Sequence, residues 1–261
     1  MGASIAFEAA LDRYRRDDYI LLTYHLHVPR PDPMTNPSTL ARQQFYGVRG
    51  TPSYYIDGDS GGGGGSSDMA KSIFDTKVDP VVDKHLAVPA EAKIDLRATT
   101  TGSTVKVKTT VSKVTSKSDK LRLQVALVEE SVRYSGENGT RFHEMVVRSL
   151  AVPASAPAKS PAAAPAADTK PAAPPQGFAL RPGKGGTFEY TFDLAKVAVE
   201  AKAHLEDFET NTRKGQYTFR EKKHEVNASA LAVVAFVQDE ATKKILQAVY
   251  VKPPAVKKTT N

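Results

Sequence analysis

The chain has 261 residues, a length typical of one or two domains, and 40% of them are hydrophobic, enough for an ordinary core. It contains no cysteine, so this chain can form no disulfide and can carry out no thiol chemistry. The formal charge of +7 is spread along a sequence without a nucleic-acid-binding motif, which argues against a nucleic-acid partner. We expect no transmembrane segment, and the sequence as given shows no signal peptide.

The first part of the chain alternates between predicted helices and strands. Residues 3–16 place Phe7 and Leu11 on an apolar stripe and Glu8 on the opposite polar face, which predicts an amphipathic helix. Residues 19–28 form a nearly continuous apolar run that ends at a proline, which predicts a central strand covered on both faces. This order of elements is typical of an α/β layer.

The next helix has clear start and stop signals. Asn36 followed by Pro37 is typical of a helix start, because Asn caps free N–H groups and proline tolerates the first helical position. Gly47 is typical of the end, where the backbone often needs a positive φ. Pro52 cannot donate to a sheet ladder and therefore stands at the start of the predicted strand 53–56.

A turn, a loop and a third helix are predicted next. The pair Asp57-Gly58 predicts a tight turn, and the glycines of 61–65 predict a flexible loop. Ser67 and Asp68 are candidates to cap the helix that follows, which Pro80 would kink or end.

From Lys93 onward the hydrophobic pattern changes to a period of two residues, which predicts antiparallel strands. Alternation is clear over 105–111 and 121–127, and further strands are predicted at 141–150, 186–193, 217–225, 229–238 and 244–252. About seven strands with regular turns predict a β-sandwich. A hairpin turn is predicted at 137–139 and a helix at 194–208.

Residues 152–177 consist almost entirely of Ala, Pro, Ser and Lys, so they cannot bury enough apolar surface to offset the entropy of ordering. Strand patterns continue on both sides, and we therefore interpret this stretch as a disordered insert. The predicted fold class is α/β plus all-β, with an α/β layer over 1–88, an antiparallel β-sandwich over 89–252 and a tail over 253–261.

The order helix, Gly47, Thr51-Pro52 and strand resembles the cis-proline segment of the thioredoxin superfamily. Residues 1–88 resemble a partial thioredoxin-like domain that lacks its opening strand and its redox cysteines. The second half, which includes 126–130, 142–148 and 234–239, resembles the C-terminal β-domain of Omp28-like exported bacterial proteins. The resemblance implies a cis peptide bond before Pro52 and a periplasmic or outer-envelope location for the full-length parent.

The absent dithiol leaves two interpretations of the chain. Either it is a fragment of a longer thiol–disulfide oxidoreductase, or it is a natural relative without cysteine. No catalytic residue is assigned, no cofactor is expected, and enzyme activity is expected only if the parent carries Cys-x-x-Cys. The alternative function is a non-catalytic module that binds a protein or peptide partner or has a structural role.

Thr51 and Pro52 form the first candidate site. In thioredoxin-like proteins the backbone before the cis-proline pairs with an extended substrate peptide, so the resemblance implies a peptide-binding role. The alternative interpretation is a turn that only sets the geometry of the strand. The neighbouring Tyr54 and Tyr55 are predicted to pack on opposite faces of their strand.

Two histidines on the predicted strand 19–28 form a second candidate site. His25 and His27 lie two residues apart and would face the same side, so with Asp32 they are candidate ligands for a metal such as zinc. Two histidines that are buried and hydrogen-bonded for structural reasons fit the pattern as well.

A third histidine is a weaker candidate. His143 lies among Glu129, Glu130 and Glu144, and a histidine among carboxylates can serve as a base or as a metal ligand. Neighbouring residues on a strand face opposite sides, which argues against a shared site for His143 and Glu144.

Overall fold

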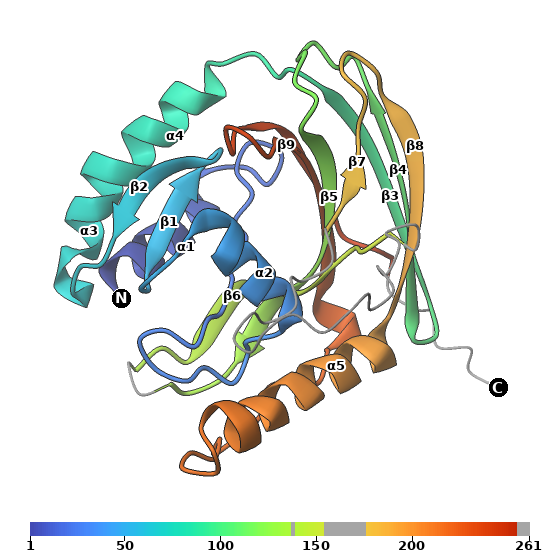
Figure 1. Ribbon diagram of the computed structural model, residues 1–261. Helices are drawn as coiled ribbons and strands as arrows, with labels where there is room; N and C mark the ends of the chain where they lie inside the picture. Colours follow the sequence, from blue (N-terminus) through green and yellow to red (C-terminus); the bar gives the residue numbers. More distant parts are fainter. Residues whose placement is uncertain (137–138, 154–175, 255–261) are drawn as a thin grey trace, which may run out of the picture.

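The computed structural model describes residues 1–136, 139–153 and 176–254 and contains both α-helices and antiparallel β-sheets (Figure 1). The expectation of a mixed α/β chain is therefore confirmed. Most of the predicted turn at 137–139, nearly all of the predicted insert 152–177 and residues 255–261 of the tail lie outside the described residues. Within the described part of the chain, no helix has the length and apolar character that a membrane span requires.

The elements follow one another along the chain with helices at the beginning and strands after residue 92. The helices are α1 (Gly2–Arg13), α2 (Pro37–Tyr46), α3 (Ala70–Ile73), α4 (Asp79–Leu86) and α5 (Leu194–Asp207). The strands are β1 (Ser53–Ile56), β2 (Asp59–Gly63), β3 (Lys93–Thr101), β4 (Thr104–Ser112), β5 (Leu121–Arg133), β6 (Phe142–Leu150), β7 (Phe178–Ala179), β8 (Gly186–Asp193), β9 (Leu231–Asp239) and β10 (Ile245–Val251). Short 3₁₀ turns cover Ser67–Met69 and Ala228–Ala230, and π-helical turns cover Phe74–Val78 and Phe208–Thr212.

The signals at the ends of α2 are confirmed. The Asn36 side chain accepts hydrogen bonds from the backbone N–H groups of Ser38 and Thr39 at 3.0 and 3.2 Å. Gly47 has a φ of 70° at the other end of the helix. The Asn36 amide also donates to the Val147 carbonyl oxygen at 2.9 Å, which fixes the start of α2 against β6.

The prediction of a strand over residues 19–28 is wrong. These residues form no regular strand, and only Thr23 makes a bridge, which is parallel and joins it to Val146 of β6. The apolar run is explained by burial. Leu21 packs against a cluster that includes α1 and against a second cluster on β5, β6 and β9, so it has apolar neighbours on both sides without a strand ladder.

The β1–β2 hairpin is built around the predicted turn at Asp57 and Gly58, which have positive φ values of 47° and 95°. The loop predicted for 61–65 is wrong in part, because residues 61–63 belong to β2. Close approach of the backbone explains the glycines. A Cβ atom on Gly63 would lie 1.9 Å from the Pro52 carbonyl oxygen, so a larger residue does not fit this register.

The third helical segment is irregular. It begins with a 3₁₀ turn whose N-cap is Ser66, one residue before the predicted cap, and it continues through Pro80 to Leu86. A π-helical turn over Phe74–Val78 precedes the proline, which lies in the first turn of α4 where no intrahelical N–H bond is required. Val82 of α4 then packs in one cluster with Phe7 of α1.

The β-rich part contains two antiparallel sheets. One has the order β10–β9–β5–β6, with β7 also paired to β5, and the other has the order β3–β4–β8. Both sheets contribute to one buried cluster, in which Leu123 and Val233 of the first sheet join Val107 and Phe192 of the second. Figure 1 shows α1, α3 and α4 on the opposite side of the larger sheet from β3, β4 and β8.

The segment after α5 differs from its prediction. Helix α5 itself is confirmed, but residues 217–225 form no strand. Phe219 is nevertheless buried, because it packs with Leu205 and Phe208 at the end of α5. The apolar positions in this segment pack against a helix, whereas the sequence pattern predicted that they belong to a sheet.

Candidate functional site

A large cleft separates the N-terminal helices and the hairpin from the larger sheet. Its volume is about 1500 Å³, and it is lined by residues of segment 17–34, of β1 and of the β9–β10 side of the sheet. Segment 17–34 forms one wall and β1 forms another. We call this space the cleft, and it contains most of the residues that the sequence singled out.

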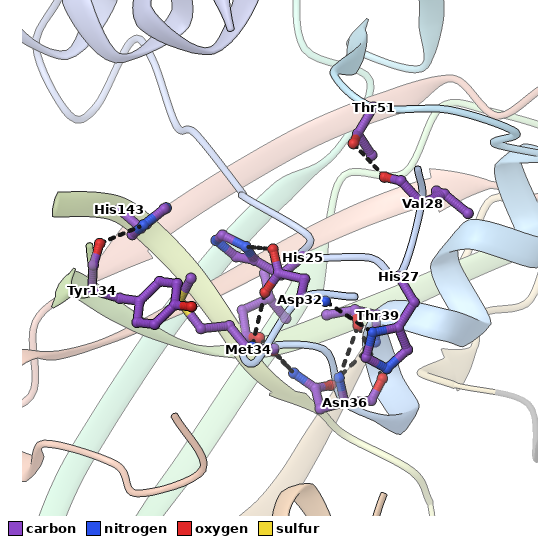
Figure 2. A network of polar contacts seen from close by, with 11 residues as sticks. His25, His27, Val28, Asp32, Met34, Asn36, Thr39, Thr51, Tyr134 and His143 are labelled. Carbon is purple, nitrogen blue, oxygen red and sulfur yellow. Dashed lines mark hydrogen bonds and ion pairs between the residues drawn. The ribbon is translucent and has the colours of Figure 1, made fainter. Parts of the chain in front are cut away.

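The Thr51–Pro52 peptide bond is cis, as the sequence resemblance implied. The Thr51 hydroxyl donates to the Val28 carbonyl oxygen at 2.5 Å, a bond visible at the right of Figure 2. The Val28–Pro29 bond is also cis, which the sequence reasoning did not anticipate. Thr51, Pro52, Val28 and Pro29 all line the cleft, so the two prolyl turns form a single fixed corner of its wall.

This corner is also linked to the start of α1. The Pro52 carbonyl oxygen accepts a hydrogen bond from the Gly64 N–H at 2.9 Å, and the Gly64 carbonyl oxygen accepts one from the Ala3 N–H at 3.2 Å. The first turn of α1 is therefore held two hydrogen bonds away from Pro52.

Strand β1 has one edge without a strand partner among the described residues. It pairs with β2 along one side, from Ser53 opposite Gly63 to Ile56 opposite Asp59. No other described strand joins this two-stranded sheet. All four residues of β1 line the cleft, as do residues 20–24 of segment 17–34.

The two tyrosines of β1 have different neighbours, as predicted. The Tyr54 ring lies 4.7 Å from the Phe7 ring of α1, whereas the Tyr55 ring lies 4.3 Å from the Tyr46 ring at the end of α2. Packing therefore accounts for both side chains, and each also contributes surface to the cleft.

His25 and Asp32 form the centre of a polar network (Figure 2). His25 Nδ1 lies 2.7 Å from Asp32 Oδ2, and the Met34 N–H donates to Asp32 Oδ1 at 2.8 Å. Burial raises the pKa of Asp32, but the charge and hydrogen bond of His25 and the Met34 N–H outweigh it and hold the pKa below its usual range. Asp32 is therefore a carboxylate that orients the His25 ring.

His27 belongs to a different environment. Its Nδ1 accepts a hydrogen bond from the Asp32 N–H at 3.1 Å, and its ring stacks on Phe208 with centroids 3.8 Å apart. Burial, together with the nearby charge of His204, lowers the pKa of His27 to about 4, so the ring is neutral. The described residues contain no group of three or more His, Cys, Asp or Glu placed to hold a metal, and the zinc site at His25 and His27 stays a prediction.

His143 lies beside His25 rather than beside the glutamates that precede it. The two imidazole rings meet edge to face with centroids 5.1 Å apart, and His143 Nε2 lies 3.1 Å from the Tyr134 carbonyl oxygen. Burial lowers the pKa of His143, and the charge of His25 adds to this effect. Glu129 instead forms an ion pair with buried Arg148, whose Nε atom lies 3.5 Å from Glu129 Oε2.

Glu130 and Glu144 have partners of their own. Glu130 accepts hydrogen bonds from Tyr250 and Lys252, and Glu144 accepts one from the Ser131 hydroxyl at 2.9 Å. A shared site of His143 with the three glutamates is therefore not formed by hydrogen bonds among the described residues.

Glu8 is the residue of the cleft that sequence reasoning missed. The helical pattern assigned it to the polar face of α1, but it is half-buried and lines the cleft. Burial, and after it the charge of Glu144, raises the pKa of Glu8 to about 7 against the opposing charge of His25. A carboxylate on the polar face of an otherwise apolar helix gave no sequence signal that distinguishes a cleft from solvent.

Comparisons with known proteins add little to this geometry. No protein-family model and no curated protein matches the chain. The chain is similar to a solved structure of a domain of the outer membrane lipoprotein Omp28 from Porphyromonas gingivalis. The identity is 16%, the TM-score is 0.30, and the match covers 64% of this chain and 91% of that chain. A similarity this weak carries no argument about fold or function.

Proposed function

We propose that this chain is a non-catalytic binding module of the bacterial envelope that holds an extended peptide in the cleft beside Thr51 and Pro52. The observation that carries the proposal is the edge of β1 that no described strand pairs with and that lines the cleft. Such an edge binds an extended peptide by β-augmentation. Main-chain hydrogen bonds then supply affinity, and pockets for alternate side chains supply specificity.

The size and composition of the cleft support a peptide ligand. Its volume of about 1500 Å³ exceeds the range of about 300–1,000 Å³ that is usual for small-molecule sites. Leu22 and Tyr54 supply apolar wall, and backbone groups of β1 supply donors and acceptors at the same place. A peptide in extended conformation uses both kinds of surface.

The fixed corner at Thr51 supports the same conclusion. Its hydroxyl bond to Val28 joins segment 17–34 to the start of β1, so the two walls are held at a set separation before any ligand arrives. A preorganised wall loses less entropy on binding than a mobile one.

The proposal includes an assignment of domains. We assign residues 1–88 to a partial thioredoxin-like domain, 89–252 to a β-sandwich domain and 253–261 to a tail. The order of α2, Gly47, the cis Thr51–Pro52 bond and β1 supports the first assignment. The core that is common to both larger sheets supports the second.

The envelope location and any redox role rest on the sequence resemblance alone. This chain has no cysteine, so thiol–disulfide exchange would belong only to a parent that carries Cys-x-x-Cys. We expect the chain to give no reduction of insulin disulfides above background, and turnover in that assay would contradict the non-catalytic assignment.

The test of peptide binding is fluorescence anisotropy with a fluorescein-labelled octapeptide of alternating valine and threonine, which favours extended backbone. We expect saturable binding with a Kd of about 1–100 μM. The matched peptide carries N-methyl groups on alternate residues, so it cannot donate along one edge, and it should bind about tenfold more weakly. Unchanged anisotropy with both peptides up to about 1 mM chain would overturn the proposal.

A pair of variants locates the site. Thr51→Val replaces the hydroxyl by a methyl group of similar size and removes the bond to Val28, so peptide affinity should fall. Thr110→Val makes the same change on β4, where the hydroxyl lies 3.1 Å from that of exposed Thr187. Equal affinities for the two variants would place the binding site elsewhere.

A further inference from the structure

Side chains that can accept hydrogen bonds line the cleft from three parts of the chain, and two of them are histidines whose ring centroids lie 5.1 Å apart. Glu8 comes from α1, His25 from segment 17–34 and His143 from β6, and all three line the cleft. Which atoms accept follows from the hydrogen bonds that the two histidines already make.

The Asp32 carboxylate determines the tautomer of His25. An ionised carboxylate only accepts hydrogen bonds, so the proton lies on Nδ1, 2.7 Å from Asp32 Oδ2. When the ring is neutral, Nε2 is left as an acceptor. The side chain is 8% exposed, and Nε2 is buried without a hydrogen-bond partner among the described residues. A buried acceptor without a partner is unfavourable, and a donor from a ligand would relieve that cost.

His143 follows the same logic. Its Nε2 lies 3.1 Å from the Tyr134 carbonyl oxygen, which only accepts, so the proton lies on Nε2. Burial favours the neutral ring by lowering the pKa of His143. The Nδ1 atom is then an acceptor too, in a ring whose centroid lies 5.1 Å from that of His25.

Glu8 contributes a carboxylate to the cleft that forms no ion pair with a cation among the described residues. None of the hydrogen bonds or ion pairs between described residues involves its carboxylate, and its strongest charged neighbour is a second carboxylate, Glu144. The charged residues that line the cleft are also mostly negative. The described lining residues include seven Asp and Glu against four Lys and Arg, in a chain whose formal charge is +7. Two of these cations, Lys244 and Arg42, are engaged in hydrogen bonds of their own, and so are three of the acids, Asp32, Asp57 and Glu91.

We propose that the peptide held in the cleft carries a lysine or arginine side chain, whose cationic head group donates to Glu8 and to Nε2 of His25. The inference rests on the proposed function and names the class of peptide that the site selects. An ammonium or guanidinium group is a multiple donor without acceptor atoms, which matches this set of acceptors.

The experiment compares three labelled octapeptides of alternating valine and threonine that differ at one central position. That position carries lysine, norleucine, which keeps the chain without the charge, or glutamate. We expect the wild-type chain to bind the lysine peptide about tenfold more tightly than the norleucine peptide, and the glutamate peptide most weakly. An arginine peptide should bind like the lysine peptide.

The variant Glu8→Gln tests the residue that is assigned to the cation. The preference for lysine over norleucine should fall to about twofold or less, because the lysine peptide loses its carboxylate partner. Glu206→Gln makes the same change of charge on α5, where the glutamate is exposed and lies 3.8 Å from Lys202, and should keep the full preference. Circular dichroism of both variants verifies that they are folded.

The possible results separate the two proposals. Equal affinity of the wild-type chain for lysine and norleucine peptides overturns this inference and leaves peptide binding intact. A preference that persists in Glu8→Gln overturns the assignment to Glu8. Failure of every peptide to bind overturns the proposed function, and this inference with it.

Discussion

At residue 8, helix α1 holds a carboxylate in the cleft close to Glu144, and this position has a cost that depends on pH. The pKa of Glu8 is raised from 4.5 to about 7, chiefly by burial. Between those two values the unfolded chain has released a proton that the folded chain still holds. The stability contributed by this residue is therefore fully present below about pH 4.5 and is lost as the pH rises toward 7.

Glu8→Gln should remove this loss. We expect the variant to be more stable than the wild type at about pH 8 by on the order of 1–2 kcal/mol, after allowance for solvent screening, and of similar stability at about pH 4.5. Urea unfolding followed by circular dichroism at both pH values measures the difference. Glu206→Gln is the control, and the same pH dependence in all three proteins would contradict the position of Glu8.

At the scale of the element, α2 depends on a single residue at its start. Asn36 is 3% exposed, its side-chain oxygen caps two N–H groups, and its amide donates to Val147 of β6. Asn36→Ala removes the cap and leaves a buried carbonyl without its partner, so we expect a loss of about 2–3 kcal/mol. Asn36→Asp keeps the cap oxygen and should recover part of this loss.

Chemical denaturation of the three proteins measures these free energies. A loss below about 0.5 kcal/mol for Asn36→Ala would mean that β6 holds the helix without the cap. Greater stability of Asn36→Ala than of Asn36→Asp would show that a carboxylate facing the Val147 carbonyl costs more than the cap contributes.

The elements that the sequence predicted are those with local causes. The ends of α2 follow from Asn36, Pro37 and Gly47, and the hairpin turn follows from the pair Asp57-Gly58, because each residue favours its own backbone geometry. Alternation is typical of the β3–β4–β8 sheet, which buries one face, whereas β9 of the larger sheet is buried along its whole length.

The predictions that were wrong concern segments whose burial depends on partners distant in sequence. The apolar run at 19–28 packs against α1 and the larger sheet without a ladder, and Phe219 is buried by the end of α5. Met145 has a φ of 55° within β6, and its carbonyl oxygen accepts a hydrogen bond from the Thr23 N–H, which no local rule predicts for methionine. The role of Glu8 was missed, and His25 and His143 were predicted as separate candidates, for the same reason: they line one cleft only in the folded chain.

At the scale of the whole molecule, the two larger sheets are coupled by their common core. Leu123 of β5 and Phe192 of β8 belong to the same buried cluster, and neither sheet buries its inner face without the other. Unfolding of one sheet would expose the apolar face of its partner to water. We therefore expect the two sheets to unfold together in one transition.

Leu123→Ala tests this coupling, because the side chain is 0% exposed within the common core. The cavity should cost about 2–5 kcal/mol and lower the midpoint of a single transition. Circular dichroism reports on the whole chain, and tyrosine fluorescence reports mainly on the N-terminal half, so coincident curves would establish one cooperative unit. Val199→Ala, at a 65% exposed position of α5, is the control and should change stability by less than about 0.5 kcal/mol. Two separated transitions in the Leu123→Ala protein would instead show that the chain does not unfold as one cooperative unit.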